Sequence, residues 1–263
     1  MIGDRQIELL PLIMRRVALE LLRRKDAWVL LILMALFAAG VIVFRMVGIE
    51  APATGTFLLN LGLTLAWFAA HLLTLLLAVR QIPEEIEQRT IYPLLARPLE
   101  RATLLAGLWT ACTASGVLCL AVLFAMAWLG VPKMEPYDAG LLAQLLALQA
   151  VSLAMMAALA MLASLIVPRG VALVALAALL VGGGQALDLL RERAAGVNEA
   201  AAAAVRWGAA YVPDFSQLNL ITRYTDGIGP LSAWEFAGLA AQGMIFTAAA
   251  LVVAAAVFRR RNL

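Results

Sequence analysis

Charged residues are scarce in this chain: Asp, Glu, Lys and Arg make up 14% of its 263 residues, whereas hydrophobic residues make up 64%. A soluble domain carries about a quarter charged residues and about half apolar ones. The composition therefore excludes a water-soluble globular enzyme and predicts an integral membrane protein. The net charge of +3 at pH 7 does not indicate a nucleic-acid partner, because the basic residues lie at the ends of apolar runs.

Histidine and cysteine are also scarce, which limits the metal and catalytic sites that the chain can build. The sequence holds one histidine, His71, and two cysteines, Cys112 and Cys119, which share one apolar run. One histidine with two cysteines cannot complete an ordinary four-ligand zinc site. An intramembrane enzyme would need clustered ionisable residues facing the bundle interior. We therefore expect no catalytic site, no metal site and no cofactor bound by this chain.

Long uncharged runs are present instead, and each is long enough for a membrane helix, which needs about 17 to 25 residues. Alternation of the barrel kind is absent, so the runs predict helices. The fold class expected is an all-α integral membrane protein with six transmembrane helices. The predicted spans cover residues 27–44, 57–79, 102–131, 141–167, 170–187 and 236–258.

The basic residues predict the orientation of these spans. Most of the 20 Lys and Arg residues lie in the N-terminal segment, in 80–101, at Arg169 and at 259–261. Cytoplasmic loops carry an excess of Lys and Arg. We therefore expect both termini in the cytoplasm and the chain in the cell (inner) membrane. Residues 1–26 precede the first span and repeat apolar residues at helical spacing, which predicts an amphipathic interfacial helix on the lipid surface.

Two connections are long. Residues 80–101 carry charges of both signs and apolar anchors, which favours a docking surface over a solvated linker. Pro83 suits the first position of a short helix there, with Glu84, Glu85 and Glu87 at its positive end. Residues 188–233 form an outer segment that begins as an alanine-rich helix and contains a Pro-Asp turn.

Residues 84–107, EEIEQRTIYPLLARPLERATLLAG, resemble the cytoplasmic segment of ABC-2-type transporter permeases, the membrane subunits of ABC exporters. In that family an acidic cluster leads to a Thr, a Leu-Leu pair, a Pro, an Arg and a further helix. The matching positions are Glu84 to Glu87, Thr90, Leu94 and Leu95, Pro98 and Arg101. The chain departs from the family pattern at Arg89, where a Gly is usual, and at Leu108, where a Lys is common.

The resemblance implies a permease that pairs in the membrane, as a homodimer or heterodimer, and binds cytoplasmic ATP-binding cassette subunits through this inner loop. The expected ATPase-binding residues are Glu84, Glu85, Ile86, Glu87, Arg89, Thr90, Leu94, Arg97 and Arg101. No G-x-x-x-x-G-K-[ST] phosphate loop occurs in the chain, so ATP and Mg would be used by the partner. A non-transporting membrane anchor or scaffold and a secondary transporter remain alternatives.

A possible substrate path follows one face of the second span, where Asn60, Thr64 and His71 share helical offsets of four and seven. His71 also fits a hydrogen bond between helices, which is the main alternative to lining a path. The other polar residues expected to be buried in the spans are Gln144, Gln149, Ser152, Gln185 and Gln242. The largely uncharged spans favour an amphipathic substrate over a highly charged one.

Overall fold

The computed structural model describes residues 52–87, 101–130, 138–196 and 212–260. It also describes the isolated helical positions Ile32, Ala35, Ala39, Glu199, Ala203, Val205 and Gly208. The predicted interfacial helix at 1–26 lies outside the described residues, as does the first predicted span at 27–44 apart from three of those positions.

Within the described ranges the chain is helical and contains no strand. Its helices are α3 (Pro52–Glu87), α5 (Arg101–Gly130), α6 (Ala139–Ile166), α7 (Arg169–Ala195), α9 (Ile221–Thr225) and α10 (Ala233–Arg260). All except α9 are long and apolar enough to cross a membrane. The second, fifth and sixth predicted spans fall inside one of these helices each, and the third and fourth end one residue beyond α5 and α6. The all-α membrane class predicted from composition is thus confirmed for this part of the chain.

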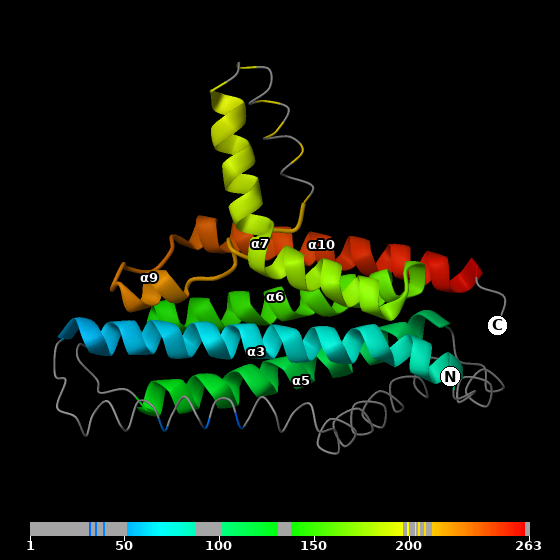
Figure 1. Cartoon of the computed structure of the whole chain (residues 1–263), viewed down its shortest axis with the longest axis horizontal. Coiled ribbons are helices and arrows are strands. Elements are labelled where there is room, and N and C mark those ends of the chain that lie inside the picture. The colour runs from blue at the N-terminus through cyan, green and yellow to red at the C-terminus, as the bar shows by residue number, and fades with distance from the viewer. Residues whose placement is uncertain are drawn as a thin grey trace.

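Four helices lie side by side in the bundle, with α3 between α5 and α6 and with α10 on the far side of α6 (Figure 1). The apolar windows of α3 and α6 are 72% and 67% buried, compared with 22% in α7 and 28% in α10. The core therefore runs between α3 and α6. The outward faces of α7 and α10 remain apolar, with Val174 and Val252 both about two-thirds exposed, as expected of surfaces that meet lipid.

Side-chain caps fix where two of these helices begin. The Asp138 carboxylate accepts hydrogen bonds from the backbone N–H groups of Gly140 (2.7 Å) and Leu141 (3.3 Å) before α6. Before α10, Ser232 and Glu235 bond reciprocally: the Ser232 N–H and hydroxyl donate to the carboxylate, and the Glu235 N–H donates to the hydroxyl. This Ser-x-x-Glu pattern is a capping box, which satisfies N–H groups that a helix start leaves without partners.

α3 does not end near residue 79, and the predicted helix start at Pro83 is wrong. The helix continues through Pro83 to Glu87. Proline in the last turns removes a single backbone hydrogen bond, and the adjoining residues Gln81 and Ile82 are buried at 5% and 3% exposure. Packing therefore outweighs the lost bond. As a result, the glutamates of this turn lie at the negative end of a helix dipole, opposite to the placement expected from sequence.

α7 continues beyond residue 187 and bends sharply along its length (Figure 1). Its first part lies against the bundle, and its second part projects away from the bundle. Gly182, Gly183 and Gly184 lie at the middle of this helix, and glycine clusters are an established cause of helix kinks. Gly184 also allows a close approach, since a Cβ placed there would clash with Ser216 and lie 3.1 Å from Asp214 Oδ1.

The second half of the predicted outer segment packs against the helices. After residue 211 the chain passes between α7 and the other helices before forming α9 (Figure 1). Phe215 and Ile221 are 1% and 0% exposed and belong to the same core as α3 and α6. We call residues 212–225 the inserted segment. Its non-helical part, 212–220, has four buried side chains, those of Asp214, Phe215, Leu218 and Leu220. Non-helical backbone within a membrane is tolerated where it is buried in protein.

Candidate functional site

His71 lies near the middle of α3 and joins it to α6. Its Nδ1 is 2.9 Å from the carbonyl oxygen of Trp67, and its Nε2 is 2.7 Å from the Ser152 hydroxyl. A carbonyl oxygen can only accept, so Nδ1 carries the proton of the neutral ring and Nε2 accepts from Ser152. Because the ring is fully buried and both nitrogens are bonded, His71 acts here as a bridge between helices.

Asn60 and Thr64, the other two residues of the predicted substrate path, lie toward the start of α3. The Thr64 hydroxyl donates to Asn60 Oδ1 at 3.3 Å, and Asn60 Nδ2 donates to the Thr225 hydroxyl at 2.8 Å. These two residues are thus brought together, whereas His71 bonds to a different helix. The inserted segment covers both ends of this face, through Thr225 at Asn60 and through Phe215, whose ring centroid lies 6.1 Å from that of His71.

The inserted segment holds its own turn through side-chain hydrogen bonds. Asp214 Oδ1 accepts from the Ser216 N–H (3.0 Å) and hydroxyl (2.6 Å), and Oδ2 accepts from Gln217 Nε2 at 2.9 Å. Asn219 Oδ1 accepts from the Ile221 N–H at 3.1 Å and from Gln149 Nε2 of α6 at 3.3 Å. Asp and Asn side chains favour such turns because they bond the backbone two residues ahead.

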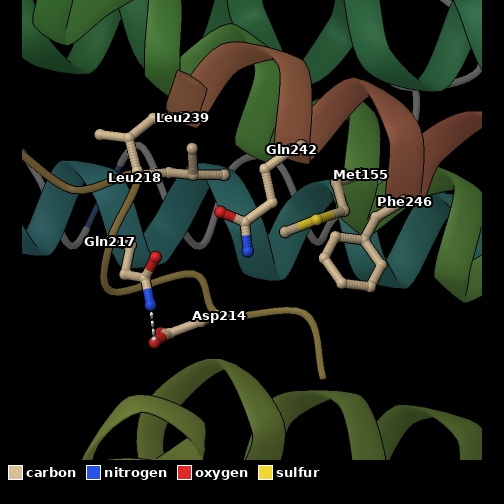
Figure 2. Close-up of a pocket in the computed structure, with 8 residues that line it drawn as sticks. Met155, Asp214, Gln217, Leu218, Leu239, Gln242 and Phe246 are labelled. Atoms are coloured by element: carbon tan, nitrogen blue, oxygen red, sulfur yellow. Dashed lines mark hydrogen bonds between the residues drawn. The ribbon is translucent and has the colours of Figure 1, made fainter. Parts of the chain in front are cut away.

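A pocket of about 210 Å³ lies between the inserted segment and the helices α6 and α10 (Figure 2). Figure 2 shows Gln242 extending from α10 toward the inserted segment, with the Gln217–Asp214 hydrogen bond on the opposite side. The lining residues are Met155, Asp214, Gln217, Leu218, Leu239, Gln242, Gly243 and Phe246. The pocket thus combines apolar walls with one carboxylate and two amides, which is the usual make-up of a small-molecule site.

The other polar residues expected to be buried in the spans differ in their surroundings. Gln149 and Ser152 are fully buried, as predicted. Gln144 is half-buried and bonds both backbone groups of Leu231 through its amide. The expectation for Gln185 is wrong, since its side chain is exposed: α7 leaves the bundle at the preceding glycines and carries Gln185 away from the other helices.

Sequence reasoning missed Asp214 and Gln217, because it assigned residues 188–233 to the space outside the bundle. The sequence nevertheless contained a signal for this site. In the stretch YVPDFSQLNL an acidic residue and three other polar residues stand among large apolar ones. An ionisable residue within an apolar membrane setting indicates a functional site by default, and Asp214 is 7% exposed.

The predicted ATPase-binding residues fall largely beyond what the structure describes. Glu84, Glu85, Ile86 and Glu87 lie in the final turn of α3 and Arg101 begins α5, but their side chains lie outside the described residues. Arg89, Thr90, Leu94 and Arg97 lie in 88–100, outside the described ranges altogether. Across the described part of the chain, no group of three His, Cys, Asp or Glu side chains is placed to hold a metal ion.

Comparison with known proteins gives no family for this chain: no protein-family model matches it, and no curated protein matches it.

Proposed function

We propose that this protein is the membrane-spanning permease of an ABC exporter, which pairs in the membrane and is driven by a separate cytoplasmic ATPase. The observation that carries the proposal is the path of α3. It extends beyond the predicted span as one unbroken helix and delivers the acidic cluster of the resemblance to its last turn. From Arg80 to Glu87 this extension measures about 12 Å at 1.5 Å per residue.

The glutamates of that turn are not explained by helix stability. Acidic residues are unfavourable at the C-terminal end of a helix, because the helix dipole is negative there. The last turn of α3 has no basic residue to offset this repulsion. This placement lowers the stability of the helix, and it is understandable if Glu84, Glu85 and Glu87 bind a basic surface on a partner. This supports a docking role for the predicted coupling loop at 80–101.

The two helices that flank residues 88–100 pack on each other. Ile82, near the end of α3, and Leu104, Leu105 and Leu108, near the start of α5, all belong to the buried core. Both ends of the loop are therefore anchored in the same tightly packed unit. Closure of two ATPase subunits against the loop would move α3 and α5 together and shift the inserted segment, which rests on α3 through Asn60 and His71.

The test is the charge-reversal pair Glu84→Lys and Glu85→Lys in the complex isolated with mild detergent from native membranes. We expect the wild-type chain to bring down a stoichiometric partner with a phosphate-loop ATPase signature. The double variant should fold normally and lose about tenfold or more of the transport-coupled ATPase activity, since each lost charged contact costs on the order of 1.5–3 kcal/mol.

A matched control is the pair Asp188→Lys and Glu192→Lys, two exposed residues on the second part of α7, which projects away from the bundle (Figure 1). It changes the net charge equally and should leave coupling unchanged. If the wild-type chain brings down no ATPase even after crosslinking at residues 84–95, the exporter proposal fails. A scaffold or a secondary transporter would then replace it.

A further inference from the structure

The pocket beside the inserted segment lies within the helical bundle. Gln242 is the tenth residue of α10, about 14 Å from its start, and Met155 lies well inside α6. The α10 side chains at the pocket, Leu239, Gln242 and Phe246, are half-buried, and the neighbouring Ile245 is 68% exposed. The pocket therefore borders the exposed apolar side of α10.

The polar lining holds one carboxylate and two amides, and it contains no basic side chain. Asp214 accepts through both carboxylate oxygens, and none of the described basic residues forms an ion pair with it. The Gln217 amide nitrogen donates one hydrogen bond to Asp214, and the Gln217 Oε1 oxygen faces the pocket (Figure 2). Among the described residues no hydrogen bond holds the Gln242 amide, so it is able to turn either of its polar atoms to a ligand.

The apolar lining completes a cation site. Phe246 offers an aromatic ring, and Met155 offers a polarisable thioether. Aromatic faces attract ammonium groups, most strongly where water is excluded, and thioether sulfur adapts to irregular ligands. The space that a water-sized molecule can occupy in this pocket is about 10 Å³, close to the roughly 10–15 Å³ that a single water molecule needs. The pocket therefore has room for a primary ammonium group, which is about the size of a water molecule, and not for a larger head group or a whole amphipathic molecule.

We propose that this pocket binds the ammonium group of an amphipathic molecule, with Asp214 as the counter-charge, Gln217 and Gln242 as hydrogen-bond partners and Phe246 against the cation. The apolar tail lies along the exposed surface of α10. The ammonium group belongs either to an amine-bearing lipid or to a free cationic amphiphile. This binding does not depend on coupling to an ATPase.

The experiment measures binding of tritiated decylammonium to the full-length chain in nanodiscs of phosphatidylglycerol, which has no amine. We expect saturable binding that decanol, at the same bilayer concentration, does not displace. Asp214→Asn and Gln242→Leu should each weaken this binding about tenfold or more, because each removes a partner of the cation. Gln185→Leu is the matched control on the exposed part of α7, and it should bind as the wild type does.

Wild-type affinity in both pocket variants, or equal displacement by decanol, overturns the proposal and leaves an apolar cavity only. If Asp214→Asn fails to fold, Gln242→Leu decides the matter, because none of the described residues hydrogen-bonds that amide. Repeating the measurement in phosphatidylethanolamine discs identifies the source: lost decylammonium binding assigns the site to the lipid head group, and retained binding assigns it to a free amphiphile.

Discussion

At the scale of single residues, three hydrogen-bonded pairs of polar side chains join different elements of this bundle. His71 on α3 accepts from Ser152 on α6, Gln149 on α6 donates to Asn219, and Asn60 on α3 donates to Thr225. A buried polar group without a partner costs about 1–3 kcal/mol. The pairs at Thr225 and Asn219 therefore hold the inserted segment against α3 and α6, and the His71–Ser152 pair joins these two helices.

Gly184 is the residue at which the close approach of α7 to the inserted segment is most easily tested. In Gly184→Ala the new methyl group would clash with Ser216, whose Cβ lies 2.7 Å from the new position. Overpacking of this kind costs about 1–3 kcal/mol. We expect the variant to unfold at a correspondingly lower temperature or SDS fraction than the wild type, measured on the purified chain by circular dichroism.

Gly182 provides the control for that substitution. It lies in the same helix two residues earlier, and a Cβ there would meet nothing within 4 Å. Alanine is favoured over glycine within a helix by about 0.5–1 kcal/mol, so Gly182→Ala should match or exceed the wild type in stability. Equal stability of the two variants would show that α7 does not press on Ser216.

At the scale of elements, hydropathy predicts which segments become helices but not how far each continues. Each of the five described long helices matches a predicted span to within one residue at the span's end or extends beyond it, because an uncharged apolar run of that length satisfies its backbone in lipid only as a helix. The continuation of α3 through Pro83 was not predictable from the same pattern. It depends on the burial of Gln81 and Ile82 against other helices, and a local sequence window contains no information on such neighbours.

The site was predictable to a smaller extent. The shared face of Asn60, Thr64 and His71 follows from helical spacing alone, and two of these residues do contact each other. The pocket was not predictable, because it combines α6, α10 and a non-helical segment from three separate parts of the chain. The placement of Asp214 depends on the bend of α7 and on contacts with core helices distant in sequence.

The insertion of residues 212–225 is itself testable by thiol labelling. In a background with Cys112→Ala and Cys119→Ala, we compare Phe215→Cys and Ile228→Cys, which the sequence alone assigns to the same outer segment. Phe215 is 1% exposed and Ile228 is 50% exposed. We expect a membrane-impermeant maleimide to label Ile228→Cys at least about tenfold faster, because reaction at residue 215 requires local opening of the packed segment.

A fold check must accompany this comparison, since Phe215→Cys removes a large buried ring and so creates a cavity. Both variants should elute as the wild type does and should become equally reactive after denaturation. Equal labelling rates in two folded variants would place the inserted segment outside the bundle.

At the scale of the whole molecule, the number of membrane crossings decides whether the two termini lie on the same side of the membrane. The described helices α3, α5, α6, α7 and α10 supply five segments long enough to cross, and the sequence predicts a sixth at 27–44. Six crossings return the chain to the side on which it began, whereas five place the two ends on opposite sides. If α5, α6, α7 and α10 all cross, the predicted coupling loop and the C-terminal basic residues lie on the same side in either case, because these four crossings separate them.

The position of the N-terminal residues therefore tests the sixth span directly. In the same cysteine-free background, single cysteines are introduced as Ile2→Cys and Asn262→Cys, and intact cells are treated with the impermeant maleimide. The excess of Lys and Arg on one side predicts that both ends are cytoplasmic. Both cysteines should then stay unlabelled until the membrane is permeabilised, and Ile228→Cys should react in intact cells as the positive control. Labelling of residue 2 alone would mean that 27–44 does not cross. The segment at 1–26 would then lie on the opposite face of the membrane from the proposed ATPase.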